Sequence, residues 1–171
     1  FHVTTPEAPM VQQLLAMMVE KGTTHVVLET TSHGLDQKRV AECEFDLAVY
    51  TNITHEHLDY HGNYVNYLQS KAQLIREIAK THKISFGNPR MVVLNKDDLS
   101  FPYLKEILNE KALRDVQKII YSCISESDFY TTKINSSAQG INFSIRHEGN
   151  EWQVNTPLLG AYNAANILAA F

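Results

Sequence analysis

Helical and strand patterns alternate along the first two-thirds of the chain, and this alternation constrains the fold more than any other feature. A helix with apolar residues at every third or fourth position is predicted to open at Pro6 and to close at Lys21-Gly22. Further helices are expected at residues 37–42, 64–80 and 100–108, and buried strands at residues 25–29, 46–51, 91–95 and 118–121. Alternation of this kind predicts an α/β, Rossmann-like fold, in which helices flank both faces of a mostly parallel sheet.

The pattern changes after Ser122. Apolar and polar residues then alternate in three short segments separated by glycine-containing turns, at residues 130–134, 141–146 and 151–155. A final helical run begins at Asn163. The carboxy-terminal part is therefore expected to hold a small antiparallel meander.

Composition places the chain among ordinary globular domains. Its 171 residues suit one domain, 20% of them are charged, and a formal net charge of -4 gives no basic excess for nucleic acid. Cys43 and Cys123 show no CxxC spacing, which favours a reducing cytoplasm, and no apolar run approaches the length needed to cross a bilayer. Because the chain opens on Phe1 and ends on Phe171 inside a helical run, we expect it to be part of a longer protein.

Polar residues follow the first two predicted strands. Glu29 ends the first strand, and His55, His57 and His61 follow the second. In an open parallel sheet, ligands collect beyond the carboxyl ends of the strands, where a carboxylate and imidazoles can share a divalent cation. For Glu29 an exposed strand-end charge is an equal alternative, and single histidines in loops are more often capping residues than ligands.

Lys71 falls within the apolar stripe of the predicted helix at residues 64–80, which turns this lysine inward. A buried ammonium costs several kcal/mol unless it is paired, so Lys71 should snorkel to solvent, meet an anion or be modified. Desolvation favours the neutral amine, which can react with carbon dioxide to give a carbamate.

Three further residues have side chains suited to ligand binding. The planar guanidinium group of Arg39 can bind a phosphate or carboxylate through two hydrogen bonds, although a solvent-exposed surface arginine is the simpler interpretation. Asn163 and Asn166 lie three residues apart, on one face of the last predicted helix, where their amides suit a purine edge. Asn163 alternatively caps that helix.

Several motifs together resemble the Mur ligases, and most closely the UDP-N-acetylmuramoyl-tripeptide synthetases. Their order and spacing cover nearly the whole chain, and the run HLDYHG with a lysine ten residues after its last histidine is specific to this branch. The matching stretches are Thr4-Thr5-Pro6, ETTSHGL from Glu29 with Arg39, HLDYHG from His57, Tyr67 with Lys71, NKDD from Asn95 and GAYNAANILAA from Gly160.

The resemblance implies roles for these positions. Glu29, His57 and Lys71 would hold Mg²⁺, with Lys71 carbamylated, and all three would serve catalysis. Contacts to a UDP-muramoyl-peptide would come from Thr4, Thr5, Thr31 and Arg39, and contacts to the adenine of ATP from Asn163 and Asn166. The implied reaction adds lysine or meso-diaminopimelate to UDP-N-acetylmuramoyl-L-alanyl-D-glutamate, through an acyl phosphate, in peptidoglycan synthesis.

Residues 1–171 would then be the central domain of such an enzyme. The family's glycine-rich phosphate loop and its carboxy-terminal domain do not occur in this sequence. We therefore expect the isolated chain to be inactive. Two alternatives stay open: a non-catalytic, Mur-ligase-like binding or regulatory module, and a metallo-hydrolase that uses His55, His57 and Asp59.

Overall fold

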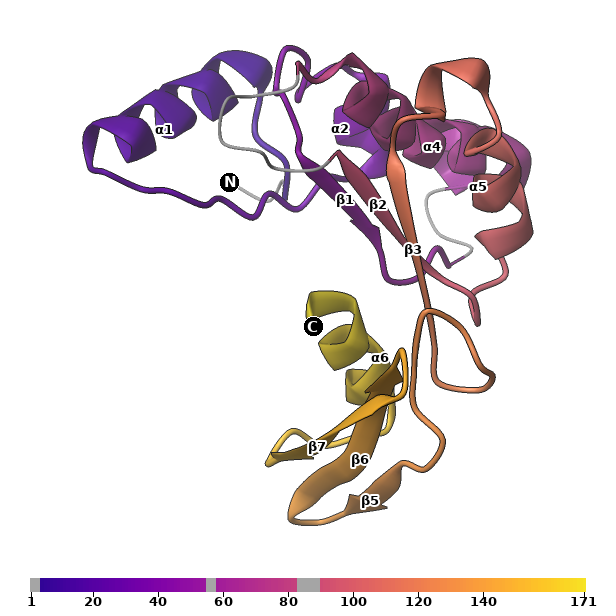
Figure 1. The fold of residues 1–171 in the computed structure, drawn as a ribbon. Coiled ribbons are helices and arrows are strands. Elements are labelled where there is room, and N and C mark those ends of the chain that lie inside the picture. Colours follow the sequence, from indigo (N-terminus) through magenta and orange to yellow (C-terminus); the bar gives the residue numbers. More distant parts are fainter. Residues whose placement is uncertain (1–3, 55–57, 83–89) are drawn as a thin grey trace.

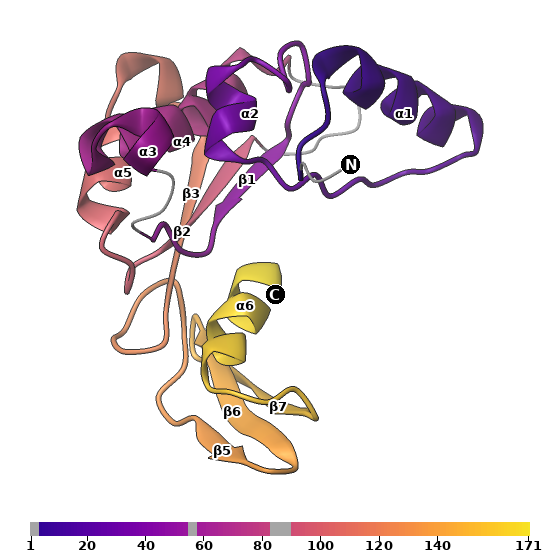
Figure 2. The ribbon, with the colours of Figure 1, turned by 180° about the vertical axis from the view of Figure 1, so that it is seen from behind.

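The computed structural model of the chain describes residues 4–54, 58–82 and 90–171. Its helices and strands are drawn in Figures 1 and 2. In chain order the elements are α1 (Ala8–Glu20), α2 (Ser32–Asp36), β1 (Leu47–Tyr50), α3 (Leu58–His61), α4 (Tyr64–Lys80), β2 (Met91–Asn95), α5 (Phe101–Ile107), a 3-10 turn (Lys111–Leu113), β3 (Gln117–Ser122), β4 (Phe129–Tyr130), β5 (Asn135–Ser137), β6 (Gly140–His147), β7 (Asn150–Thr156) and α6 (Tyr162–Ala170).

One sheet runs through the described part of the chain, in the order β1-β2-β3-β4-β6-β5, and β7 pairs with β6. The pairs β1–β2, β2–β3 and β3–β4 are parallel, whereas β4 pairs antiparallel with β6, and β6 pairs antiparallel with β5 and β7. The sheet is therefore parallel where the chain alternates helix and strand, and antiparallel where the sequence pattern changes. Both parts of the predicted fold class are confirmed.

Alternate residues of β2 serve opposite faces of the sheet. Val92 and Leu94 point into a core with α4 and α5, and Val93 points into a second core with α6 and the inner face of β6. Tyr121 of β3 is fully buried in this second core. The two cores put α4 and α5 on one face and α6 on the other, which confirms helices on both sides (Figures 1 and 2).

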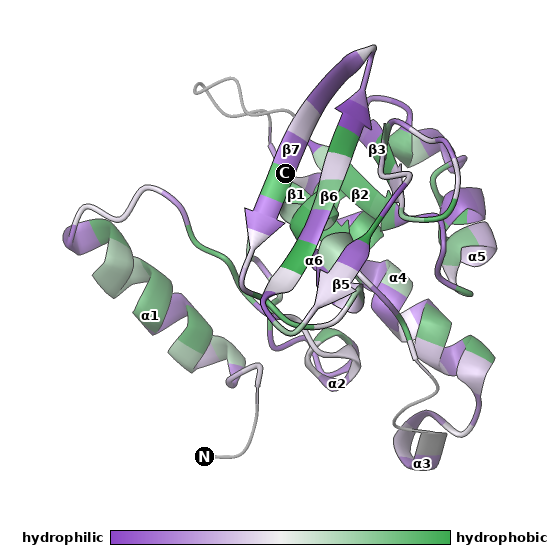
Figure 3. Ribbon diagram, turned by 90° about the horizontal axis from the view of Figure 1, so that it is seen from below, coloured by the Kyte–Doolittle hydropathy of each residue, from purple (hydrophilic) through white to green (hydrophobic). Residues whose placement is uncertain are grey.

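The predicted strand at residues 25–29 is wrong. The structure assigns no strand there, and the side chain of Val27 is fully exposed. A strand requires a hydrogen-bonded neighbour, and among the described residues β1 is the edge strand on its side of the sheet. The adjoining helix α1 buries only Val11 and stands away from the sheet (Figures 1 and 3).

Two other element predictions were also wrong in part. The helix predicted at residues 37–42 lies earlier, at Ser32–Asp36, because Thr31 caps it and Lys38 adopts a left-handed φ of 56° that ends helical hydrogen bonding. The segment at 130–134 contributes only the end of the two-residue strand β4, which pairs parallel with β3. The β6–β7 hairpin is confirmed, and positive φ angles at Glu148 and Gly149 form its two-residue turn.

No helix in the described ranges is long and apolar enough to cross a membrane.

Candidate functional site

Thr5 forms the centre of a buried polar cluster that joins the start of the chain to the residues before α2. Its hydroxyl donates to the Glu29 carbonyl at 3.1 Å and lies 3.1 Å from the Thr31 hydroxyl, and the Thr31 amide donates to it at 2.9 Å. Thr31 also caps α2, since its hydroxyl accepts from the Gly34 amide at 3.0 Å. Two of the three predicted substrate-binding threonines, Thr5 and Thr31, are thus in direct contact, although Thr5 itself is 1% exposed.

Arg39, which follows α2 in the chain, belongs to the same cluster. Its guanidinium donates to the Thr5 carbonyl at 2.9 Å and to Gln37 Oε1 at 2.9 and 2.5 Å, and it forms an ion pair with Glu7 at 3.2 Å. The side chain is 14% exposed. This arginine therefore lies beside the threonines. Most of the hydrogen-bond donors of its guanidinium group already contact acceptors of the protein. Thr4 is exposed at the edge of the cluster.

Lys71 reaches the same segment from α4. Its Nζ donates to the Thr30 carbonyl at 3.3 Å, and its own carbonyl accepts from the Tyr50 hydroxyl of β1 at 2.6 Å. The side chain is half-buried, while its stripe neighbours Tyr67, Leu68, Ile75 and Ile78 are buried. The inward orientation predicted from helical periodicity is confirmed, because the ammonium turns toward α2 instead of solvent.

Glu29 is adjacent to the Thr30 carbonyl that Lys71 contacts, so the backbones of these two predicted metal ligands are brought together. The carboxylate of Glu29 is exposed and makes no hydrogen bond or ion pair within the described residues. Glu29 and Asn52 do not end neighbouring strands, since Glu29 follows an unpaired segment. His57, the third predicted ligand, and His55 lie outside the described residues.

The described ranges contain no group of three His, Cys, Asp or Glu side chains placed to hold a metal ion. The donor chemistry nevertheless fits Mg²⁺ in one respect: Lys71, whose amine can become a carbamate, bonds to the backbone of the residue next to Glu29, which carries an exposed carboxylate. Asp59, the third residue of the alternative hydrolase motif, lies on α3 with its side chain exposed.

His61 is a residue whose role the sequence did not reveal. It is 7% exposed, and its ring bridges α2 and α4: Nε2 lies 3.0 Å from the Ser32 hydroxyl and Nδ1 lies 3.3 Å from the Ser70 hydroxyl. The rings of His33, Tyr60 and Tyr67 surround it at centroid distances of 5.4, 4.8 and 5.4 Å. Its place in the HLDYHG run was the only available signal.

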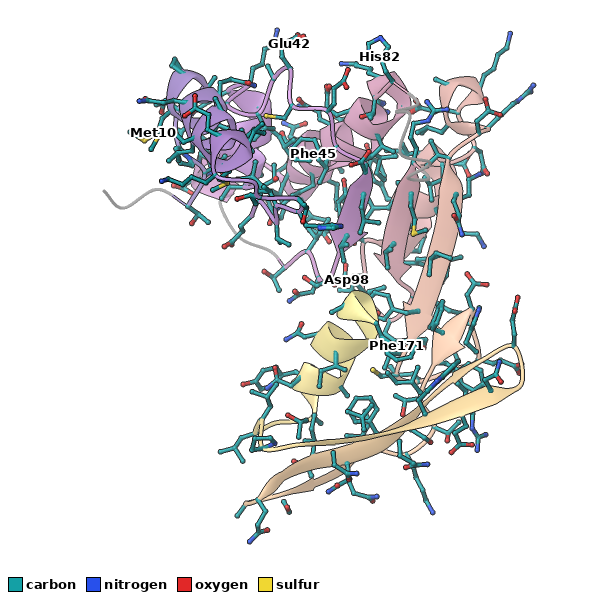
Figure 4. All side chains as sticks on the ribbon, turned by 60° about the vertical axis from the view of Figure 1, so that its left-hand side comes forward. Met10, Glu42, Phe45, His82, Asp98 and Phe171 are labelled. Carbon is teal, nitrogen blue, oxygen red and sulfur yellow. The ribbon has the colours of Figure 1, made fainter. Side chains whose placement is uncertain are left out.

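The loop after β2 carries the NKDD run at the carboxyl edge of the parallel strands. Asp97 accepts from the Cys123 amide at 2.6 Å and the Ser122 hydroxyl at 2.5 Å, and Asp98 accepts from the Ile53 amide at 3.2 Å. Burial, followed by the nearby Asp97 carboxylate, raises the pKa of Cys123 to about 11. Figure 4 shows Asp98 at the end of the parallel strands that faces α6 and the antiparallel hairpin. These carboxylates tie three loops together at that edge.

Asn163 and Asn166 lie on one face of α6, as predicted. Asn166 Nδ2 donates to Asn163 Oδ1 at 3.2 Å, and Asn163 Nδ2 donates to the Leu159 carbonyl at 2.8 Å. Asn163 does not cap α6, whose N-cap position is Ala161. Asn166 is exposed, which leaves its amide oxygen accessible to a ligand.

Comparison with known proteins accounts for the whole chain. Residues 1–171 match the family model of the Mur ligase middle domain. A UDP-N-acetylmuramyl-tripeptide synthetase of Oceanobacillus iheyensis is 34% identical over 98% of this chain, and a UDP-N-acetylmuramoyl-L-alanyl-D-glutamate–2,6-diaminopimelate ligase of Synechocystis is 36% identical over the same share. The chain spans only 32% and 31% of those relatives, respectively.

Solved structures agree in fold. The structure of a UDP-N-acetylmuramoyl-L-alanyl-D-glutamate–2,6-diaminopimelate ligase superposes on 98% of this chain with a TM-score of 0.84 at 30% identity, and this chain covers 32% of it. A MurF ligase of Thermotoga maritima in complex with ADP shares the fold over 75% of this chain and 26% of its own, with a TM-score of 0.53 at 14% identity.

Proposed function

Since this chain belongs to the Mur ligase family, of which it is a middle domain, we propose that it is the ATP-binding domain of a longer UDP-N-acetylmuramoyl-tripeptide synthetase. The parent enzyme would add lysine or meso-diaminopimelate to UDP-N-acetylmuramoyl-L-alanyl-D-glutamate in the cytoplasm, during peptidoglycan synthesis. ATP would be its co-substrate and Mg²⁺ its metal. Relatives three times as long support a parent enzyme that supplies the phosphate loop and the amino-acid-binding domain.

One observation carries this proposal: the contact between Lys71 Nζ and the Thr30 carbonyl. It joins α4 to the segment that holds Glu29 on one side of Thr30 and Thr31 on the other. This contact supports the proposal because it brings Lys71 and Glu29, the proposed metal ligands, next to Thr31, although Lys71 and Thr30 are 41 residues apart in sequence. A hydrolase built on His55, His57 and Asp59 gives neither Lys71 nor the asparagine pair on α6 a role.

In this proposal the residues of the chain act mainly by placement. Thr31 presents a hydroxyl and Arg39 a positive charge to the UDP-muramoyl-peptide, while the buried Thr5 holds Thr31 in place. These groups hold the substrate carboxylate in line with the terminal phosphoryl group of ATP. Glu29, His57 and Lys71 would hold Mg²⁺, which would neutralise charge on the phosphoryl oxygens. Lys71 supports the metal as a carbamate, formed when its neutral amine adds to carbon dioxide and releases a proton. Asn163 and Asn166 offer amides to the adenine.

The test is amide formation by the full-length protein. Purified enzyme is incubated with ATP, Mg²⁺, UDP-N-acetylmuramoyl-L-alanyl-D-glutamate and an equimolar mixture of lysine and meso-diaminopimelate, and products are identified by mass. We expect one tripeptide product and one ADP for each amide formed. A full-length protein that binds the UDP-substrate without consuming ATP would support the non-catalytic module instead. Zinc-dependent hydrolysis would support the metallo-hydrolase.

A further inference from the structure

We propose that His61 is a positioning residue that fixes the Glu29–Ser32 segment against α4, and so sets the geometry between Lys71 and the substrate threonines. This inference rests on the proposed ligase function for its catalytic consequence. Its structural content, a clamp between two segments, stands on the contacts of His61 alone.

The clamp has two ends. His61 Nε2 meets the hydroxyl of Ser32, the first residue of α2, and Nδ1 meets the hydroxyl of Ser70, inside α4. Both serines are buried, at 1% and 5% exposure. A neutral imidazole has one donor and one acceptor nitrogen, and each serine hydroxyl can donate or accept, so both ends are satisfied in either tautomer.

The neighbours of the two serines are the site residues. Ser32 follows Thr31, whose hydroxyl contacts Thr5, and Ser70 precedes Lys71, whose ammonium contacts Thr30. The segment is thus tied to α4 at two adjacent points, the Ser32–His61–Ser70 bridge and the Lys71–Thr30 bond. Carbamylation of Lys71 removes its ammonium but leaves the Ser32–His61–Ser70 bridge unchanged. The imidazole is then the spacer that fixes the distance between the threonines and the modified lysine.

The ring itself has little freedom to move. Tyr60 meets it edge-on, with an interplanar angle of 81°, and Tyr67 of α4 contacts it from the helix. The Asn66 amide also donates to the His61 carbonyl at 2.9 Å, which holds the backbone at the end of α3. A ring held in this way transmits its position to Ser32.

Asparagine and glutamine separate the two ends of the clamp. The amide of His61→Asn reaches the place of Nδ1 and keeps the Ser70 contact, whereas that of His61→Gln reaches the place of Nε2 and keeps the Ser32 contact. In the full-length enzyme we expect His61→Asn to lower kcat by about 10- to 100-fold, since displacements near 1 Å cost that much. His61→Gln should lose less of the kcat than His61→Asn, because it keeps the contact that positions the Ser32 segment, and the KM for the amino acid should not change in either variant.

A second measurement does not depend on activity. Hydrogen exchange of the amides of residues 31–35 in the full-length protein should be faster in His61→Asn than in wild type, and should lie between these two rates in His61→Gln. If His61→Asn fails to fold, Ser32→Ala takes its place as the test variant. It removes the other partner of the same contact and should give the same faster exchange and lower kcat. Thr81→Val is the matched control: it removes a buried hydroxyl that donates to the Phe45 carbonyl at 2.8 Å, at the far end of α4, and should leave kcat unchanged.

The outcomes distinguish the two proposals. If wild type forms no amide, the ligase function is wrong, and the hydrogen-exchange comparison still decides the clamp. Equal exchange at residues 31–35 in the Asn and Gln variants would overturn the clamp. Equal loss of kcat in both, with unchanged exchange, would also overturn it, because His61 would then act on something other than Ser32.

Discussion

Gly34→Ala should destabilise the protein by forcing Thr5 out of its hydrogen bonds. Gly34 is the third residue of α2 and is buried against Thr5. A Cβ added there would lie 2.9 Å from both Cβ and Cγ2 of Thr5 and 3.0 Å from its hydroxyl oxygen. Carbon atoms in contact normally lie about 3.5–4.0 Å apart, so Thr5 would have to retreat by roughly 0.5–1 Å.

The expected cost follows from what holds Thr5. Its hydroxyl makes contacts of 2.9 to 3.1 Å with Glu29 and Thr31, and a retreat of that size carries most of them past bonding distance. Two lost hydrogen bonds cost about 1 kcal/mol each, and residual crowding adds about 1 kcal/mol. Alanine returns up to about 1 kcal/mol of helix propensity. The net destabilisation is about 2 kcal/mol.

The assay is urea and thermal unfolding of the 171-residue chain, in which about 2 kcal/mol corresponds to a Tm lowered by roughly 4–8 °C. The control is a double-mutant cycle with Thr5→Ala, which removes the hydroxyl and Cγ2 and frees residue 5 to move. In that background the cost of Gly34→Ala should fall by at least half. A Gly34→Ala protein as stable as wild type, or the same cost in both backgrounds, would refute the reasoning.

Three further predictions follow from particular contacts. Tyr50→Phe, which removes the hydroxyl that donates to the Lys71 carbonyl, should lower the free energy of unfolding by about 1 kcal/mol in urea titrations; no change would contradict the importance of that bond. The hydrogen bond from Arg76 lowers the pKa of Glu110, so the stability from this exposed pair, at most about 1 kcal/mol, is present above the unfolded pKa near 4.5 and is lost as pH falls through the lower folded pKa. Glu110→Gln should remove that part of the loss of Tm at acid pH. If the pH dependence of Tm is the same in Glu110→Gln and wild type, the pair makes no such contribution. The isolated chain should neither hydrolyse ATP nor form an amide, because it lacks a phosphate loop; Mg²⁺-dependent phosphate release would contradict this.

Local periodicity explains what the sequence predicted well. The stripe along α4 correctly placed Lys71 on the inward face, since a three- to four-residue repeat depends only on the helix itself. The strands β1, β2 and β3 were found because each is a short apolar run between clear helix signals. The resemblance in motif order assigned Thr5, Thr31 and Arg39 to contacts with one substrate, and the structure shows that these residues contact one another.

Features that depend on distant partners were not predictable in this way. The apolar run at residues 25–29 has the composition of a strand, but pairing is decided by a neighbour, and β1 supplies none to it in the described chain. The end of α2 depends on the left-handed backbone of Lys38, which no propensity indicated. His61 looked like one loop histidine among several, because its two serine partners are 29 and nine residues away.

The central claim is that Lys71 serves amide-bond formation, and its most direct test is the turnover of Lys71→Ala in the full-length enzyme. The measured quantity is the rate of ATP-dependent amide formation, with and without added bicarbonate. We expect Lys71→Ala to be nearly inactive and insensitive to bicarbonate, because alanine provides no amine to form the metal-binding carbamate, while Lys71→Glu should lose less. Near-normal turnover by Lys71→Ala would contradict the account and leave Lys71 as a structural lysine bonded to Thr30.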